Sequence, residues 1–156
     1  MALTALAGIA GETPDQQWSQ VPIVPAPAIG VVDTTVHYTL HRGAGVWSDE
    51  HGIKAANYLI GYCRDNLGLP LKMVNRKAEA AIRMCKAEQK IPGCNASYIL
   101  SVNNTGVDLK GDTEDQIFYG VMSLLQLLPS RPGDVPVMNG IGVVDNNRYG
   151  YRGMHL

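Results

Sequence analysis

The histidines are the first residues to consider for metal chemistry. His37 and His41 are four positions apart, and on a strand that spacing would separate them by about 13 Å along one face, too far to share an ion. His51 and His155 are isolated, and the sequence contains no HExxH. The histidines therefore predict no metal site.

Two pairs of adjacent acids, Asp49-Glu50 and Glu114-Asp115, are the candidates for acid/base chemistry. Each pair falls in the expected first turn of a helix, where a negative charge suits the positive end of the helix dipole. Neighbouring side chains on a helix point in different directions, so neither pair suits work on one bond. We therefore expect both pairs to be structural.

Motifs for nucleophiles and phosphates are also missing, since the sequence has no G-x-S-x-G, P-loop or G-x-G-x-x-G. Its three cysteines show no C-x-x-C spacing, which argues against zinc and leaves two interpretations: three unpaired, mostly buried thiols, or one Cys85–Cys94 bridge in an exported chain. Asn95 and Asn103 begin glycosylation sequons, which equally suit ordinary turns.

The closing segment 143–156 differs from the rest of the chain. It holds two arginines and two tyrosines, and it ends in the apolar-rich Met154-His155-Leu156, unlike a solvated tail. One interpretation is a last edge strand. The other is that the chain stops at the start of a second domain.

The composition of the chain limits the number of domains and the classes of partner that it can have. The 156-residue chain has a formal charge of −1, with 46% apolar and 17% charged residues, which suits one folded domain. The near-zero charge argues against a nucleic acid or an anionic membrane as partner, and no apolar run approaches the roughly 18 residues of a membrane span. Residues 1–20 are expected to be a leader with little structure, either a clipped export signal or a frayed terminus.

Two helices are expected. Ser48 is the predicted cap of the first, whose apolar stripe would end before Gly68 and Pro70 and consists of Ile53, Ala56, Ile60, Cys63 and Leu67. Thr113 and Gln116 form a capping box for the second, which Pro129 ends and whose buried face would consist of Ile117, Val121, Leu124, Leu125 and Leu128. Gly120 would allow close approach to another backbone.

The other segments favour strands. Residues 21–27 contain three prolines and should form an extended segment along an edge, while 36–40 are typical of a strand. Residues 98–110 predict a β-hairpin, whereas 78–90 fit a helix by propensity and a strand by alternation. Strands that do not alternate regularly with helices indicate an α+β fold with helices on one sheet face.

Three parts of the sequence, in order, are similar to one known family. They are the opening Ile23-Val24-Pro25-Ala26-Pro27, the run from Tyr98 through Phe118-Tyr119-Gly120 to Leu128, and the closing Val144-Asp145…Arg148-Tyr149…Tyr151-Arg152-Gly153-Met154. They resemble the hairpin, long helix and "R-Y-x-Y-R-G-M" junction of glycoside hydrolase family 20, the exo-acting, chitobiase-like β-N-acetylhexosaminidases. Asn147 departs from the family's usual proline.

The resemblance implies a domain plan. Residues 21–145 would be the family's non-catalytic N-terminal domain, a mostly antiparallel sheet with two α-helices on one face, in a zincin-like topology without zinc. It would make 81–86 a strand. Residues 146–156 would be the linker and first-strand stub of an absent (β/α)8 catalytic barrel.

The resemblance also implies an activity. The parent enzyme would remove terminal N-acetylhexosamine from glycans by substrate-assisted retaining hydrolysis, without a cofactor. Its catalytic Asp-Glu pair would lie outside this chain, which would be inactive alone. Arg152 would bind the C3 and C4 hydroxyls of the sugar, since a guanidinium can donate to two neighbouring oxygens. The partners would be the barrel and glycans ending in N-acetylhexosamine, in a secreted, periplasmic or lysosome-like compartment.

Two alternatives remain. A carbohydrate-binding module would need exposed aromatic platforms, for which Trp18 and Trp47 are the large rings, although Trp47 is expected to pack at the start of the first helix. A purely structural or interaction domain that docks on the barrel is compatible with the main interpretation.

Overall fold

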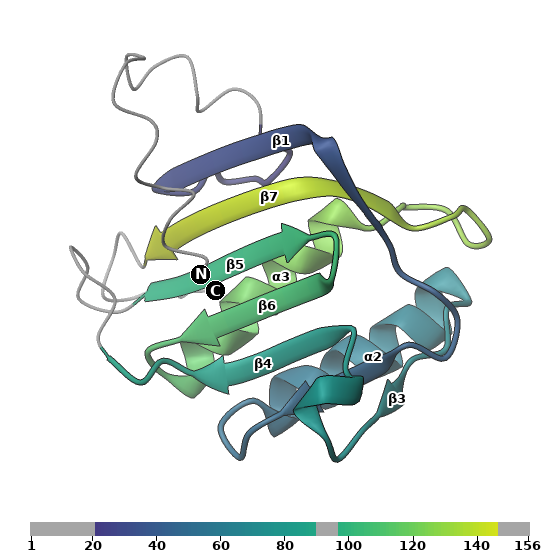
Figure 1. Cartoon of the computed structure of the whole chain (residues 1–156), viewed down its shortest axis with the longest axis horizontal. Coiled ribbons are helices and arrows are strands. Elements are labelled where there is room, and N and C mark those ends of the chain that lie inside the picture. The colour runs from purple at the N-terminus through teal and green to yellow at the C-terminus, as the bar shows by residue number, and fades with distance from the viewer. Residues whose placement is uncertain (1–20, 90–96, 147–156) are drawn as a thin grey trace, which may run out of the picture.

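A computed structural model describes residues 21–89 and 97–146, which form one seven-stranded sheet with two α-helices on one face (Figure 1). In chain order the elements are β1 (Ile29–Thr39), β2 (Gly45–Ser48), α2 (Ile53–Leu67), β3 (Lys72–Met73), the 3₁₀ turn η1 (Lys77–Glu79), β4 (Ile82–Lys86), β5 (Ser97–Asn103), β6 (Gly106–Gly111), α3 (Glu114–Leu127) and β7 (Val137–Asn146).

The sheet has the strand order β1-β7-β5-β6-β4-β2-β3. In this sheet order, the three neighbouring pairs β1–β7, β7–β5 and β5–β6 are antiparallel. The three pairs β6–β4, β4–β2 and β2–β3 are parallel. The antiparallel registers are the longer ones, and α2 follows β2 as the crossover that parallel neighbours need. The α+β class and the two helices on one face are confirmed, with a sheet of mixed direction.

The core lies between the sheet and the helix layer. Alternate residues along the central strands are buried, as expected of a sheet with one covered face. The largest fully buried side chains come from both layers and include Leu59, Ile82, Met84, Leu100, Leu109, Ile117 and Leu124.

Helix α3 begins where its sequence predicts. The backbone N–H of Gln116 donates to Thr113 Oγ1 at 3.3 Å, which confirms the cap. The second half of the capping box is wrong, because Gln116 is buried and its Oε1 accepts no hydrogen bond within the described structure. Gly120 permits a close approach, as predicted, but the neighbour is the side chain of Leu109 in β6 and not a backbone.

On α3 the predicted buried face is correct for Ile117, Val121 and Leu124, while Leu125 is half-buried. Leu128 is buried but lies at the C-cap, one residue past the helix.

Helix α2 begins later than predicted. Ser48 does not cap it but ends β2, and the helix starts at Ile53 after Gly52, without a side-chain cap. Asp49 and Glu50 therefore precede the helix instead of occupying its first turn. The physical reason is that the Asp49 carboxylate fixes the preceding turn to β4, as described below.

The buried face of α2 is rotated from the predicted stripe. Ala56, Cys63 and Leu67 are buried as expected, but Ile53 is 48% exposed and Ile60 is half-buried. Ala55 and Leu59 are buried instead, because α2 packs against α3 as well as the sheet. The predicted end is correct, since Gly68 adopts a left-handed φ of 63°.

Most of the strand predictions agree with the structure. The hairpin 98–110 is confirmed as β5 and β6, and the strand expected at 81–86 is confirmed as β4, which begins at Ile82. Of residues 36–40, all but Leu40 belong to the longer β1. Residues 21–28, here called the leading segment, have no regular strand, and Val21 and Ile23 are buried. The leading segment therefore contributes to the core as well as bordering it.

Candidate functional site

Arg152, the residue predicted to bind substrate, lies outside the described residues, as do Tyr149, Tyr151 and the stub 147–156 as a whole. Cys94 and Asn95 lie outside them too, so the Cys85–Cys94 bridge stays a prediction. Asn103 lies at the end of β5, where its Oδ1 accepts from the N–H (2.8 Å) and hydroxyl (2.6 Å) of Thr105, which is ordinary turn geometry.

The histidines that can be placed do not meet. His37 is exposed on β1, His41 is exposed beyond its end, and His51 lies before α2. Within residues 21–89 and 97–146, no three His, Cys, Asp or Glu side chains are grouped so as to hold a metal ion.

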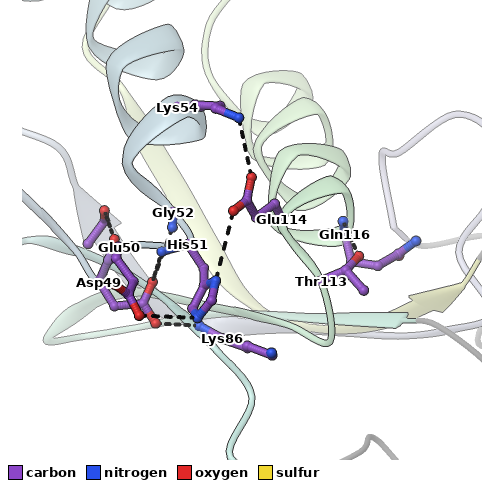
Figure 2. Close-up of polar contacts among 10 residues, drawn as sticks. Asp49, Glu50, His51, Gly52, Lys54, Lys86, Thr113, Glu114 and Gln116 are labelled. Carbon is purple, nitrogen blue, oxygen red and sulfur yellow. Dashed lines mark hydrogen bonds and ion pairs between the residues drawn. The ribbon is translucent and has the colours of Figure 1, made fainter.

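Asp49 links three segments, as Figure 2 shows. Its Oδ1 accepts from the backbone N–H groups of His51 and Gly52, each at 3.1 Å, and its Oδ2 accepts from the N–H of Lys86 at 2.7 Å. A carboxylate held by three backbone donors closes the turn before α2 against the end of β4. Asp49 is therefore structural, as expected, although by a different contact.

The other acids at the helix starts form a solvent-exposed network (Figure 2). The ring nitrogens of His51 lie 3.7 Å from Glu50 Oε1 and 3.9 Å from Glu114 Oε1, and Lys54 Nζ lies 3.5 Å from Glu114 Oε2. The side chains of Glu50 and Glu114 are 86% and 51% exposed, and exposed pairs at these distances contribute little to stability. The arrangement connects the first turns of α2 and α3 and does not enclose a substrate.

Trp47 is the one large ring of the sugar-platform hypothesis that the structure describes, and it lies in β2. Lys77 Nζ lies 5.3 Å from its ring centroid, in cation–π range. Trp47 thus contacts Lys77 of η1, and its expected packing at the start of α2 stays a prediction.

Arg83 and Asp108 face each other from β4 and β6. Arg83 Nε and Nη2 donate to the two carboxylate oxygens of Asp108 at 2.6 and 2.9 Å, and these hydrogen bonds raise the pKa of Arg83. Arg83 Nη1 also donates to the carbonyl of Ala80 at 3.2 Å, so its donors serve the protein itself.

A shallow groove of about 220 Å³ lies where the ends of β1 and α2 meet the loop before β7. Arg42, on its wall, donates from Nη1 to the carbonyl of Gly68 at 2.5 Å. The titratable groups there, His41 and Asp134, are exposed, and the lining offers no nucleophile beside a base.

An aromatic cluster marks the outer side of the helix layer. The rings of Tyr58 on α2 and Phe118 on α3 meet edge to face with centroids 5.2 Å apart, and Tyr62 lies 6.3 Å from Tyr58. Tyr58 is 43% exposed, and Ile53, in the first turn of the same helix, is 48% exposed. Sequence reasoning missed this cluster, although the four-residue spacing of Tyr58 and Tyr62 places them on one helix face.

None of the helices in the described ranges combines the length and apolar character that crossing a membrane requires.

Comparison with known proteins agrees with this picture. Residues 20–145 match the family model described as glycosyl hydrolase family 20, domain 2. No curated protein matches the chain.

Solved structures share the fold. A Streptomyces plicatus β-hexosaminidase aligns with a TM-score of 0.73 and 25% identity over 85% of this chain and 27% of its own, and the Streptomyces coelicolor GH20 β-N-acetylhexosaminidase with 0.70 and 26% over 85% and 28%. A GH20 exo-β-N-acetylglucosaminidase from Vibrio harveyi has the same fold, with a TM-score of 0.71 and 17% identity over 85% of this chain and 20% of its own.

The chain thus spans about a fifth to just over a quarter of these three enzymes. The matched region covers the described strands and helices except Asn146, the last residue of β7. The chain belongs to glycosyl hydrolase family 20, of which residues 20–145 are domain 2.

Proposed function

We propose that this chain is the accessory domain of an exo-β-N-acetylhexosaminidase that removes terminal N-acetylhexosamine by substrate-assisted retaining hydrolysis. The observation that carries the proposal is the family match over residues 20–145, supported by solved relatives that are named as hexosaminidases. The described residues add support, because Asp49 serves backbone donors, Asp108 pairs with Arg83, and Glu50 and Glu114 form exposed ion pairs. The domain alone is inactive, and the enzyme works in a secreted, periplasmic or lysosome-like compartment.

Arg152 is the proposed sugar-binding residue of this chain. Its guanidinium donates to the C3 and C4 hydroxyls of the terminal sugar, because two donors of one planar group match two neighbouring oxygens. In this proposal the reacting groups are a carboxylic acid of the catalytic domain and the substrate's own acetamido group. The two-carboxylate scheme of most glycosidases does not apply.

The proposed partner is the enzyme's own catalytic domain, and the aromatic cluster of Tyr58, Tyr62 and Phe118 is the surface it covers. An exposed aromatic ring backed by two half-buried ones is typical of a surface that another protein surface buries. The catalytic domain is the chosen occupant because most of the length of each matched enzyme lies outside the region shared with this chain.

The test is hydrolysis of an aryl N-acetyl-β-glucosaminide by the enzyme in which this chain is joined to its catalytic domain. We expect turnover, and we expect Arg152→Ala to reduce kcat/KM by about 10²-fold or more, because hydrogen bonds from a charged group are lost. Arg131→Ala, which removes another exposed arginine, is the control and should leave kcat/KM unchanged. No turnover by the joined enzyme, or equal activity of the Arg152 variant, would contradict the proposal.

A further inference from the structure

Asp145 joins the beginning of the domain to its end. It is the penultimate residue of β7, and its Oδ1 accepts from the backbone N–H of Ala28 in the leading segment at 3.0 Å. The two residues are 117 positions apart in the sequence. One carboxylate therefore holds the last residues of the final strand against the chain that precedes β1.

The same carboxylate is connected to the core. Tyr98, its cross-strand neighbour on β5, has its hydroxyl 3.5 Å from Asp145 Oδ2 and 2.6 Å from Ser123 Oγ on α3. Each hydroxyl carries one proton, so when Tyr98 donates to Asp145, Ser123 must donate to Tyr98. The three side chains then form a directed line of hydrogen bonds from α3 through β5 to the end of β7.

Burial makes this line more than a surface contact. Tyr98 is 3% exposed and Ser123 is 5% exposed, so a hydroxyl without its partner would be left without water to replace it. The leading segment is fixed to α3 a second time, because Val24 N–H donates to Gln126 Oε1 at 2.8 Å and Gln126 Nε2 donates to Val24 O at 3.2 Å. Both ends of the domain are thus tied to the same helix.

The end of β7 is also where the chain leaves toward Arg152. Arg152 lies six positions after Asn146, and a chain of that length reaches about 20 Å at most. The place and direction of the last β7 residues therefore restrict where the Arg152 guanidinium can be presented.

We propose that Asp145, with Tyr98 and Ser123, is a positioning unit for Arg152. This inference rests on the proposed function, since it assumes that Arg152 binds the sugar. Loosening the end of β7 weakens the grip of Arg152 on the substrate in the ground state and the transition state alike. Such a loss raises KM and leaves kcat nearly unchanged, whereas partial unfolding lowers kcat through the active fraction and leaves KM unchanged.

The experiment measures kcat and KM for an aryl N-acetyl-β-glucosaminide with the enzyme that joins this chain to its catalytic domain. Asp145→Ala should raise KM about 3- to 10-fold, the worth of one or two hydrogen bonds, and kcat should stay within about twofold. Asp145→Asn keeps an acceptor for Ala28 N–H and should restore most of the wild-type KM. Tyr98→Phe keeps the ring in the core and removes only the hydroxyl, so it should give a smaller increase in KM. It provides a second test in case the alanine variant folds poorly.

Asp33→Ala is the matched control, because Asp33 also accepts from a backbone N–H and a hydroxyl, those of Thr35 at 2.9 and 2.6 Å, but at the β1 bulge. It should leave KM unchanged. A wild-type KM in Asp145→Ala and Tyr98→Phe, or a fall in kcat alone that follows the folded fraction seen by circular dichroism, would overturn the inference while Arg152→Ala still upheld the proposed function. If the wild-type enzyme shows no turnover, the proposed function fails and this inference fails with it.

Discussion

The two helices begin by different means, although their first turns are connected (Figure 2). Helix α3 is started by its own residue, since Thr113 Oγ1 accepts from Gln116 N–H three positions on. Helix α2 has no side-chain cap, and the turn before it is held by Asp49, which also accepts from Lys86 N–H 37 residues away. The start of α3 is therefore encoded locally, whereas that of α2 depends on a finished sheet.

The glycines within the two helices also differ, in the space that surrounds them. A Cβ on Gly120 of α3 would overlap Leu109, whereas a Cβ on Gly61 of α2 would meet nothing within 4 Å. The α3 surface is thus fitted closely to β6 at its middle, whereas α2 has open space at Gly61 and is fixed to β4 through the turn before its start. Loss of a contact should be costly at different places on the two helices.

The largest effect should come from Asp49→Ala. We expect a loss of about 3 kcal/mol in the free energy of unfolding, roughly 1 kcal/mol for each of its three backbone hydrogen bonds. Asp49→Asn keeps one acceptor oxygen and should fall between the alanine variant and wild type. Urea unfolding of the 156-residue chain measures both. A cost for Asp49→Ala no greater than that of removing the Thr113 cap would break the contrast.

The next effect concerns pH, because α2 buries a thiol. Burial raises the pKa of Cys63 from its ordinary value of 9.0 to about 11. The unfolded thiol therefore ionises first as the pH rises above 9, which favours the unfolded state until the folded thiol ionises near 11. Wild type should lose up to about 2 kcal/mol over that range beyond what Cys63→Ala loses, since one pKa unit corresponds to about 1.4 kcal/mol.

Urea unfolding at intervals from pH 8 to 11 measures this difference between the two proteins. The raised pKa of Tyr38, which burial causes, affects both chains equally and cancels. Parallel stability curves above pH 9 would contradict a buried, protonated Cys63.

The paired glycine substitutions should have opposite signs. Gly120→Ala should lower the free energy of unfolding by about 1–2 kcal/mol, because overlap with the fully buried Leu109 outweighs the better helix propensity of alanine. Gly61→Ala has open space and should raise stability by up to about 1 kcal/mol. Thermal unfolding followed by circular dichroism compares the pair, and equal shifts would show that α3 is not the more tightly fitted helix.

The smallest effect should be that of Thr113→Ala, about 1 kcal/mol for one helix cap. Thr113→Ser keeps the hydroxyl acceptor and serves as the control, with little loss expected. Denaturant midpoints distinguish the two, and a cost for the serine variant equal to that of alanine would show that the cap contributes nothing.

The sequence predicts those parts of the fold in which the interacting residues lie within a few positions of each other. The start of α3, the end of α2 at Gly68 and the β5–β6 hairpin are of this kind. The start of α2 was predicted too early, because the Asp49 carboxylate bonds to the end of β4, which is distant in the sequence. The stretch around β4 has helix propensity but forms a strand between β2 and β6, where Ile82 and Met84 are fully buried. Its alternating pattern left helix and strand open, and the family resemblance favoured the strand.

The candidate site was less predictable than the fold. Arg152 was identified through the resemblance alone and lies outside the described residues. The contacts of Asp145 with Ala28 and Tyr98 join segments far apart in the sequence, so no local sequence pattern predicts these contacts. The aromatic cluster also needs both helices in place, because Phe118 comes from α3 and its neighbours come from α2.

The central claim is that this chain is an accessory domain that does not catalyse by itself. The most direct measurement is hydrolysis of an aryl N-acetyl-β-glucosaminide by the purified 156-residue chain, beside the same amount of the enzyme that also contains the catalytic domain. Our account predicts release of the aryl alcohol by the joined enzyme and none above background by the chain alone. Turnover by the 156-residue chain, or none by the joined enzyme, would contradict it.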